Sequence, residues 1–230
     1  GAGKSSLARS LVRNCSVLTD ETERTVILDR LPWTPETDLN LQLYDFGGHT
    51  WYQVVQPFFL DKSAIIVLVV NLATYQRSEY EEHVGCWLSL MQARAPGATV
   101  KMVGTNIDRC STDEASEKVA SILEEMRIKE NLEVELLKKA IAKGGKSLEE
   151  AQTSSLCSSL ERRIVLPEKM HLVSSKTLEN FHALKTEILI AARQQGKVIP
   201  ASWQNLLDTI NLSALNNKEK KFLTLNDILH

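Results

Sequence analysis

The sequence predicts an α/β fold in which a mostly parallel β-sheet carries helices on its faces. Short β-branched runs alternate with helical patterns along the chain. One run, IIVLVVN at 65–71, is apolar on both faces, which is typical of a central parallel strand. The composition of the 230 residues, 43% apolar and 24% charged with a net charge of −2, is that of a globular chain and gives no indication of a nucleic-acid partner.

The elements follow one another in an order that fits this fold. We expect five strands, at 24–30, 38–45, 64–71, 99–105 and 168–174. We expect helices between them at about 5–14, 78–95 and 177–195.

A helical insert is predicted before the last strand, at about 111–165. Asp108 and Ser174 are separated by 174 − 108 − 1 = 65 residues, too many for an ordinary α/β connection. Apolar residues recur at helical spacing through the interval, and Gly144-Gly145 separates a first helix from a second at about 147–163.

A domain boundary is predicted near residue 196, where Gly196 and Pro200 interrupt the helical pattern. Residues 196–230 are too few to form a core of their own, and the chain opens inside a motif, so we expect a piece of a longer protein. No apolar stretch approaches the roughly 20 residues of a membrane span. The four cysteines form no C-x-x-C pair, which favours reduced thiols and a cytosolic protein.

The first six residues, Gly1-Ala2-Gly3-Lys4-Ser5-Ser6, match the end of the phosphate-binding pattern G-x-x-x-x-G-K-[ST]. In that pattern backbone N–H groups surround phosphate oxygens at a helix N-terminus, Lys4 would contact the β and γ phosphates, and the Ser5 hydroxyl would bind Mg²⁺. A glycine turn that caps a surface helix is the alternative interpretation.

A carboxylate followed by glycines comes next, in Asp45-Phe46-Gly47-Gly48-His49 directly after the strand LNLQLY. Asp45 would hold a water bound to Mg²⁺, and the Gly48 N–H would meet the γ-phosphate. An Asx-type turn needs only the same Asp and Gly, and is the alternative.

Two further strand ends carry residues suited to a purine. Asp108, in Val103-Gly104-Thr105-Asn106-Ile107-Asp108, can accept from both N1–H and the 2-amino group of guanine, which adenine does not offer, although a helix cap would also use an Asp here. The loop Ser174-Ser175-Lys176 ends the last predicted strand and would support the base.

Taken together, these motifs resemble the Ras-like GTPase superfamily, and within it the Roc domain of Roco proteins, over about residues 1–195. GAGKSS resembles the phosphate loop, DFGGH the second switch, TNID the base-reading motif and SSK the last base-contacting loop. Thr25, in RTVILD, resembles the first-switch threonine that binds Mg²⁺, with Thr22 as its rival. Residues 197–230 look like the linker and start of the COR domain that follows Roc.

The resemblance implies a three-layer Ras-like fold with a P-loop, whose first strand would precede residue 1. It implies a slow Mg²⁺-dependent GTPase that binds GTP and GDP, signals to the adjoining COR domain and forms a homodimer through COR. Two departures matter. Thr105 and Asn106 replace the usual Asn and Lys of N-K-x-D, so the stacking lysine is missing, and His49 stands where a water-orienting glutamine is usual.

His49 would support hydrolysis as a catalytic residue together with Gly48 and Lys4, because imidazole can accept from water or stabilise negative charge. A solvent-facing His49 with no such role is the alternative. A non-hydrolysing scaffold of the same fold, used for dimerisation or protein docking, therefore stays open as a second function. An ATPase or small-molecule kinase is disfavoured by Asp108 and the SSK loop.

Overall fold

The computed structural model describes residues 1–20, 25, 28–47, 64–144 and 150–196. One compact unit spans Gly1–Gln194, and a second begins at Gln195 and lies almost entirely outside the described residues. The elements along the chain are α1 (Lys4–Arg13), β1 (Leu28–Glu36), β2 (Leu39–Phe46), β3 (Ile65–Asn71), α2 (Cys86–Arg94), β4 (Thr99–Thr105), α3 (Thr112–Gly144), α4 (Glu150–Glu161), β5 (Met170–Leu172) and α5 (Phe181–Gln195).

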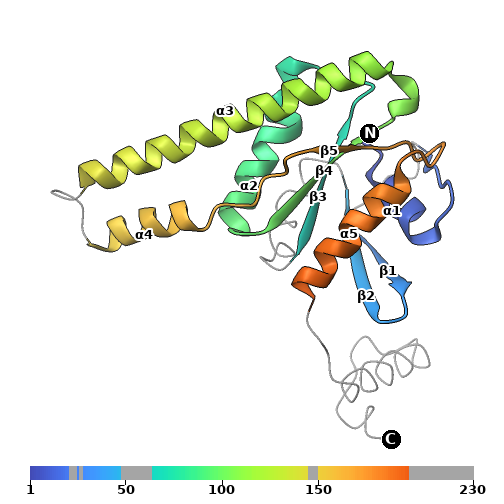
Figure 1. Ribbon diagram of the computed structural model, residues 1–230, viewed down its shortest axis with the longest axis horizontal. Coiled ribbons are helices and arrows are strands. Elements are labelled where there is room, and N and C mark those ends of the chain that lie inside the picture. Colours follow the sequence, from blue (N-terminus) through green and yellow to red (C-terminus); the bar gives the residue numbers. More distant parts are fainter. Residues whose placement is uncertain (21–24, 26–27, 48–63, 145–149, 197–230) are drawn as a thin grey trace, which may run out of the picture. The chain divides into compact units, whose positions relative to one another are not determined.

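A parallel sheet of β3, β4 and β5, in that order, forms the centre of the first unit (Figure 1). Asn71 pairs with Thr105, and Gly104 pairs with Leu172, so the three strands end at nearly the same level. The carboxyl ends of parallel strands share one edge of a sheet, which is where α/β folds place ligands. The predicted strands at 64–71 and 99–105 agree with β3 and β4 within one residue, whereas β5 is shorter than predicted.

The first two strands form a separate antiparallel hairpin. Its turn has two residues, Thr37 and Asp38, between the paired Glu36 and Leu39. The prediction of a strand at 24–30 was wrong at its end, because β1, described from Leu28, continues through two prolines to Glu36, whereas residues 24, 26 and 27 lie outside the described residues. Proline is tolerated there because β1 pairs only with β2 among the described strands and so has one edge that needs no donors.

Two apolar clusters cover the two faces of the parallel sheet. Side chains of β3 alternate between them, as the period of a strand requires. One cluster joins the sheet to α2 and α3, and its members include Ile66, Leu68, Val70, Val84, Leu88, Val100, Met102, Ile122 and Met126. The other joins it to α1, α5 and the hairpin, and includes Leu7, Leu11, Trp33, Val103, Val173, Phe181, Leu184 and Ile188. The result is the predicted architecture, a sheet between two layers of helices.

Two helices differ from their predicted extents. The interval predicted as one helix at 78–95 contains a 3₁₀ turn at Arg77–Glu79 and a π-helical turn at Glu81–Gly85 before α2. Gly85 leaves room for the Glu81 side chain, since a Cβ at Gly85 would clash with Glu81 Oε2. The helix predicted at 177–195 begins at Phe181, after two residues with positive φ.

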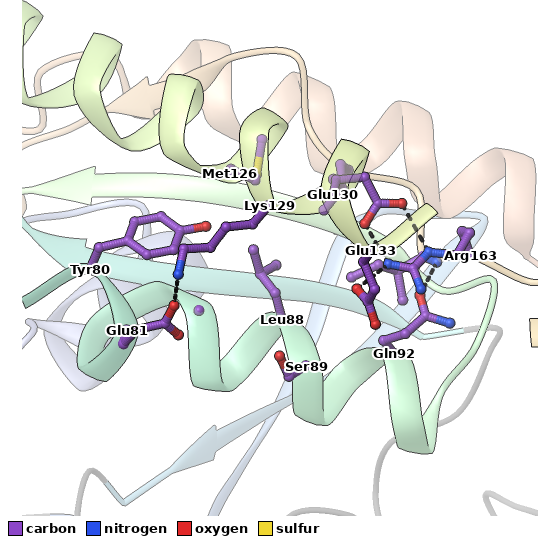
Figure 2. A pocket seen from close by; sticks show the side chains of 13 residues that line it. Tyr80, Glu81, Leu88, Ser89, Gln92, Met126, Lys129, Glu130, Glu133 and Arg163 are labelled. Carbon is purple, nitrogen blue, oxygen red and sulfur yellow. Dashed lines mark hydrogen bonds and ion pairs between the residues drawn. The ribbon is translucent and has the colours of Figure 1, made fainter. Parts of the chain in front are cut away.

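The insert consists of α3, 33 residues long, and α4. Arg163, just after α4, donates to Glu130 at 2.9 and 2.5 Å and to Glu133 at 2.6 Å. The side chain of Gln92, on α2, accepts from the Ile164 N–H at 2.9 Å. These groups line a cavity of about 90 Å³ beneath α3 (Figure 2). The charged bonds thus join α3 to the segment that follows α4, and the neutral bond ties that segment to α2.

All four cysteines are free thiols. Among the described helices, none combines the length and the apolar character that crossing a membrane requires.

Candidate functional site

The N-terminus of α1 presents the loop predicted to bind phosphate. Gly3 precedes the helix with φ +75°, a conformation that side chains other than glycine rarely adopt, and its carbonyl accepts from Leu7 N at 2.9 Å. A Cβ on Gly3 would approach Thr105 Oγ1 to 3.6 Å. The loop therefore lies against the end of β4, with Lys4 and Ser5 in the first turn of a helix whose dipole favours an anion.

Three oxygen-bearing side chains meet next to this turn. Ser5 Oγ lies 2.9 Å from Thr25 Oγ1, and Thr25 Oγ1 donates to Asp45 Oδ2 at 3.1 Å. Asp45, at the end of β2, is only 5% exposed. All three groups were predicted metal ligands, and hydroxyl and carboxylate oxygens suit a hard cation such as Mg²⁺. We call Ser5, Thr25 and Asp45 the oxygen triad.

Lys4 shares this environment. Its partial burial lowers its pKa below the ordinary value, and the nearby Asp45 carboxylate opposes that shift. A dehydrated ammonium beside a carboxylate is poised to gain from a further anion. Within the described part of the chain, no group of three His, Cys, Asp or Glu side chains offers an alternative metal site.

The predicted base-contacting residues meet at a second point on the same edge. Ser174 is fully buried and donates to Asp108 Oδ1 at 2.7 Å. Its hydroxyl also accepts from the backbone N–H groups of Lys176 and Thr177, each at 3.2 Å. Asp108 itself is exposed, so its carboxylate is oriented by Ser174 and remains accessible to a ligand.

Hydrogen bonds connect the loop before α1, next to the oxygen triad, with the end of β4 that leads to Asp108. Thr105 Oγ1 donates to the Ala2 carbonyl at 2.8 Å, which joins the end of β4 to the phosphate loop. Asn106 Nδ2 donates to Asn71 Oδ1 at 2.8 Å, and Asn71 Nδ2 donates to the Gly1 carbonyl at 3.3 Å. The two residues that depart from N-K-x-D therefore fix the phosphate loop against the sheet.

Two of these contacts were not foreseen from the sequence. Asn71 is a polar residue directly at the end of a buried strand, and that position was the available signal. Ser16 donates to the Ser175 carbonyl at 2.8 Å, a contact 159 residues apart in the chain that no local pattern indicates.

The other predicted site residues are placed as follows. The Ser6 hydroxyl contacts Thr19 Oγ1 at 2.9 Å and accepts from Thr19 N at 3.1 Å, so its side chain holds the segment after α1. Lys176 is exposed beside the loop that carries Ser175. Gly48, His49 and the rival threonine Thr22 lie outside the described residues.

Part of the chain is similar to a known family. The family model described as "Ras of Complex, Roc, domain of DAPkinase" matches residues 1–108. Malignant fibrous histiocytoma-amplified sequence 1 of Homo sapiens is 40% identical over 105 residues, which is 45% of this chain and 10% of that protein. Its homolog in Mus musculus is 34% identical over 191 residues, 81% of this chain and 17% of that protein.

Among solved structures, the Roco2 RocCORdC protein of Methanosarcina barkeri, bound to GDP, aligns with a TM-score of 0.48 and 15% identity. The alignment covers 99% of this chain and 56% of that one. The chain spans only 10 to 17% of the length of the histiocytoma-amplified relatives. Residues 1–108 are thus similar to Roc domains, and the chain has the Ras-like α/β fold, with its parallel sheet between two helical layers, that this similarity implies.

Proposed function

We propose that this chain binds GTP and GDP with Mg²⁺ and acts as a slowly hydrolysing switch. The observation that carries the proposal is the oxygen triad of Ser5, Thr25 and Asp45 beside Lys4 at the N-terminus of α1. Nucleotide phosphates bind to a positively charged side chain, to backbone N–H donors and to Mg²⁺. Lys4, the N-terminus of α1 and the oxygen triad would supply these three in turn.

The triad is suited to Mg²⁺ by its chemistry. Two hydroxyls and one carboxylate are hard oxygen donors, and together they leave several positions around the ion for phosphate oxygens and water. Mg²⁺, when bound, would neutralise charge on the β and γ phosphates. Lys4 would add a second positive charge at the same place.

Guanine selectivity would come from Asp108. Its carboxylate can accept from N1–H and the 2-amino group together, whereas adenine presents an acceptor at N1. The hydrogen bond from Ser174 holds the carboxylate in one orientation, so that less conformational freedom is lost when the base binds.

A switch would arise at Thr25. Its hydroxyl contacts both Ser5 on α1 and Asp45 on β2, so a ligand that draws Thr25 toward a γ-phosphate changes the segment between these elements. The neighbouring domains that this change would reach include the predicted COR segment from residue 196. Hydrolysis would use His49 near Gly48, as the sequence predicts.

Titration of fluorescent GTP, GDP and ATP, with and without Mg²⁺, tests the proposal. We expect GTP and GDP to bind in preference to ATP, and Lys4→Ala to abolish binding. Asp45→Asn is expected to reduce the dependence on Mg²⁺, whereas Asp113→Asn, an exposed carboxylate in the first turn of α3, is the matched control and changes neither. Asp108→Asn should shift preference from GTP toward xanthosine triphosphate. Equal affinity for ATP and GTP would refute the assignment of Asp108.

Single-turnover hydrolysis separates the switch from the scaffold. A switch releases phosphate from bound GTP, and His49→Ala slows that release. A scaffold retains the nucleotide without releasing phosphate, which would contradict the hydrolytic part of the proposal while leaving the binding part intact.

A further inference from the structure

An exposed apolar stripe runs along the second half of α3. It consists of Ile128, Leu132 and Leu136, which are 52, 59 and 57% exposed. Their spacing of four residues places them on one side of the helix, one turn apart. Three large apolar side chains in a row on one helix face are more than the scattered exposed residues of an ordinary surface.

The opposite side of the same stretch faces the protein. Val134, Leu137 and Ile141 are half-buried and lie roughly half a turn around the helix from the stripe, at about 100° per residue. Helix α4 runs alongside one side of α3 (Figure 1). The stripe is therefore not the face that α3 uses to pack in its own chain.

Charge is distributed unevenly along α3 on either side of the stripe. Before Arg127 the helix carries five carboxylates and one lysine, and after Leu136 it carries three lysines and no carboxylate. Two copies of α3 in parallel would place like charges together. Two antiparallel copies would place the acidic half of each beside the basic half of the other.

We propose that the stripe is a self-association surface, on which a second copy of this chain packs its own α3 antiparallel, with the two-fold axis at Leu132. In this arrangement residue 132 − n faces residue 132 + n of the other copy. Ile128 then packs on Leu136, and Glu125 faces Lys139, while each Leu132 meets its equivalent. The surface is self-complementary, as a two-fold interface requires.

The charged pair is available for this contact. Glu125 approaches Arg77 and Lys129 in its own chain only at 4.0 Å, the outer limit of an ion pair, and its side chain is 29% exposed. Lys139 is exposed. The apolar area is small compared with that of a permanent dimer, so the association is expected to be weak and to weaken further in high salt.

Sedimentation equilibrium of the full 230-residue chain tests the proposal. We expect a reversible dimer at high micromolar concentration, and at least a tenfold loss of association in Leu132→Asp. Ile190→Asp is the matched control, because Ile190 is a 50% exposed apolar residue on α5, away from the stripe. A chain that stays monomeric, or a control that dissociates the dimer equally, would overturn the proposal.

Charge exchange and cross-linking test the orientation. Glu125→Lys and Lys139→Glu should each weaken the dimer, and the double variant should restore it. With the four native cysteines changed to serine, Leu132→Cys should form a disulfide-linked dimer, and Ile128→Cys should cross-link far more readily with Leu136→Cys than with itself. Failure of the double variant to recover, efficient Ile128–Ile128 cross-linking, or capture of a different protein's helix in place of the second copy would refute the antiparallel dimer.

Discussion

Ser174→Ala tests how the end of the site that we propose contacts the base is held together. The substitution removes a 2.7 Å hydrogen bond to the Asp108 carboxylate and an acceptor for two backbone N–H groups at 3.2 Å. A hydrogen bond to a charged group contributes about 1.5–3 kcal/mol, and each neutral one about 0.5–1.5 kcal/mol. Because Asp108 is exposed and can be rehydrated, we take the low end of these ranges and expect a loss of about 2–3 kcal/mol in the free energy of unfolding.

Nucleotide affinity should fall in the same variant. Without Ser174 the carboxylate must be ordered by the ligand, and a penalty of about 1–2 kcal/mol corresponds to roughly a 5- to 30-fold weaker Kd for GTP. Urea denaturation measures the first effect and titration with fluorescent GTP the second. Ser159→Ala is the matched control, since the Ser159 hydroxyl makes an exposed hydrogen bond to the Ser155 carbonyl on α4 and has no place in the predicted site.

The free energy of unfolding and the Kd for GTP together show which part of this reasoning is wrong. If stability falls but GTP affinity does not, then Asp108 does not read the base in an orientation set by Ser174. If neither changes, the hydrogen bonds at Ser174 do not stabilise this loop.

Three further predictions concern the scaffold around the site. Burial, followed by the charge of Lys169, lowers the pKa of His171, so between its folded pKa and the ordinary value of about 6.5 the unfolded chain binds more protons than the folded chain. The free energy of unfolding should therefore fall as the pH drops through this window, and should fall less in His171→Gln. Thermal melts from pH 7.5 to 5 measure this. Equal pH dependence in both proteins would contradict this. Gly104→Ala would bring a Cβ within 2.5 Å of Leu72 Cδ1 in a fully buried site, and should lower the free energy of unfolding, measured by urea denaturation, by about 1–3 kcal/mol. An unchanged midpoint of denaturation would show that Leu72 can move aside. Arg163→Met removes the hydrogen bonds to Glu130 and Glu133, and should lower the free energy of unfolding by about 1–3 kcal/mol and increase hydrogen exchange in α4. Unchanged exchange would mean that these bonds do not anchor the insert.

The sequence was informative about strands whose burial pattern is simple. β3 and β4 were predicted within one residue because β3 is an apolar run, β4 is rich in β-branched residues, and both end in a polar residue. The end of β1 was predicted poorly because proline residues usually end a strand. Only the pairing with β2 shows that one edge of β1 has no described partner strand and so tolerates proline.

The sequence indicated candidate site residues where a residue type has few uses, and their roles stay predictions. Lys4, Ser5, Asp45 and Asp108 were chosen for their chemistry, and the fold brings them to one edge of the sheet. The hydrogen bonds of Asn71 and Ser16 could not be predicted, because their partners are distant in sequence and the pairing depends on how the loops pack.

The junction between Asp108 and α3 has a mechanical consequence. Only Arg109, Cys110 and Ser111 separate Asp108, the carboxylate that we propose contacts the base, from a helix of 33 residues, about 50 Å long. A tilt of about 5° at the first turn of this rod moves its far end by about 4 Å. If α3 moves as a rigid rod, a slight movement at its first turn becomes a displacement comparable to the size of a side chain at a point remote from the proposed nucleotide site.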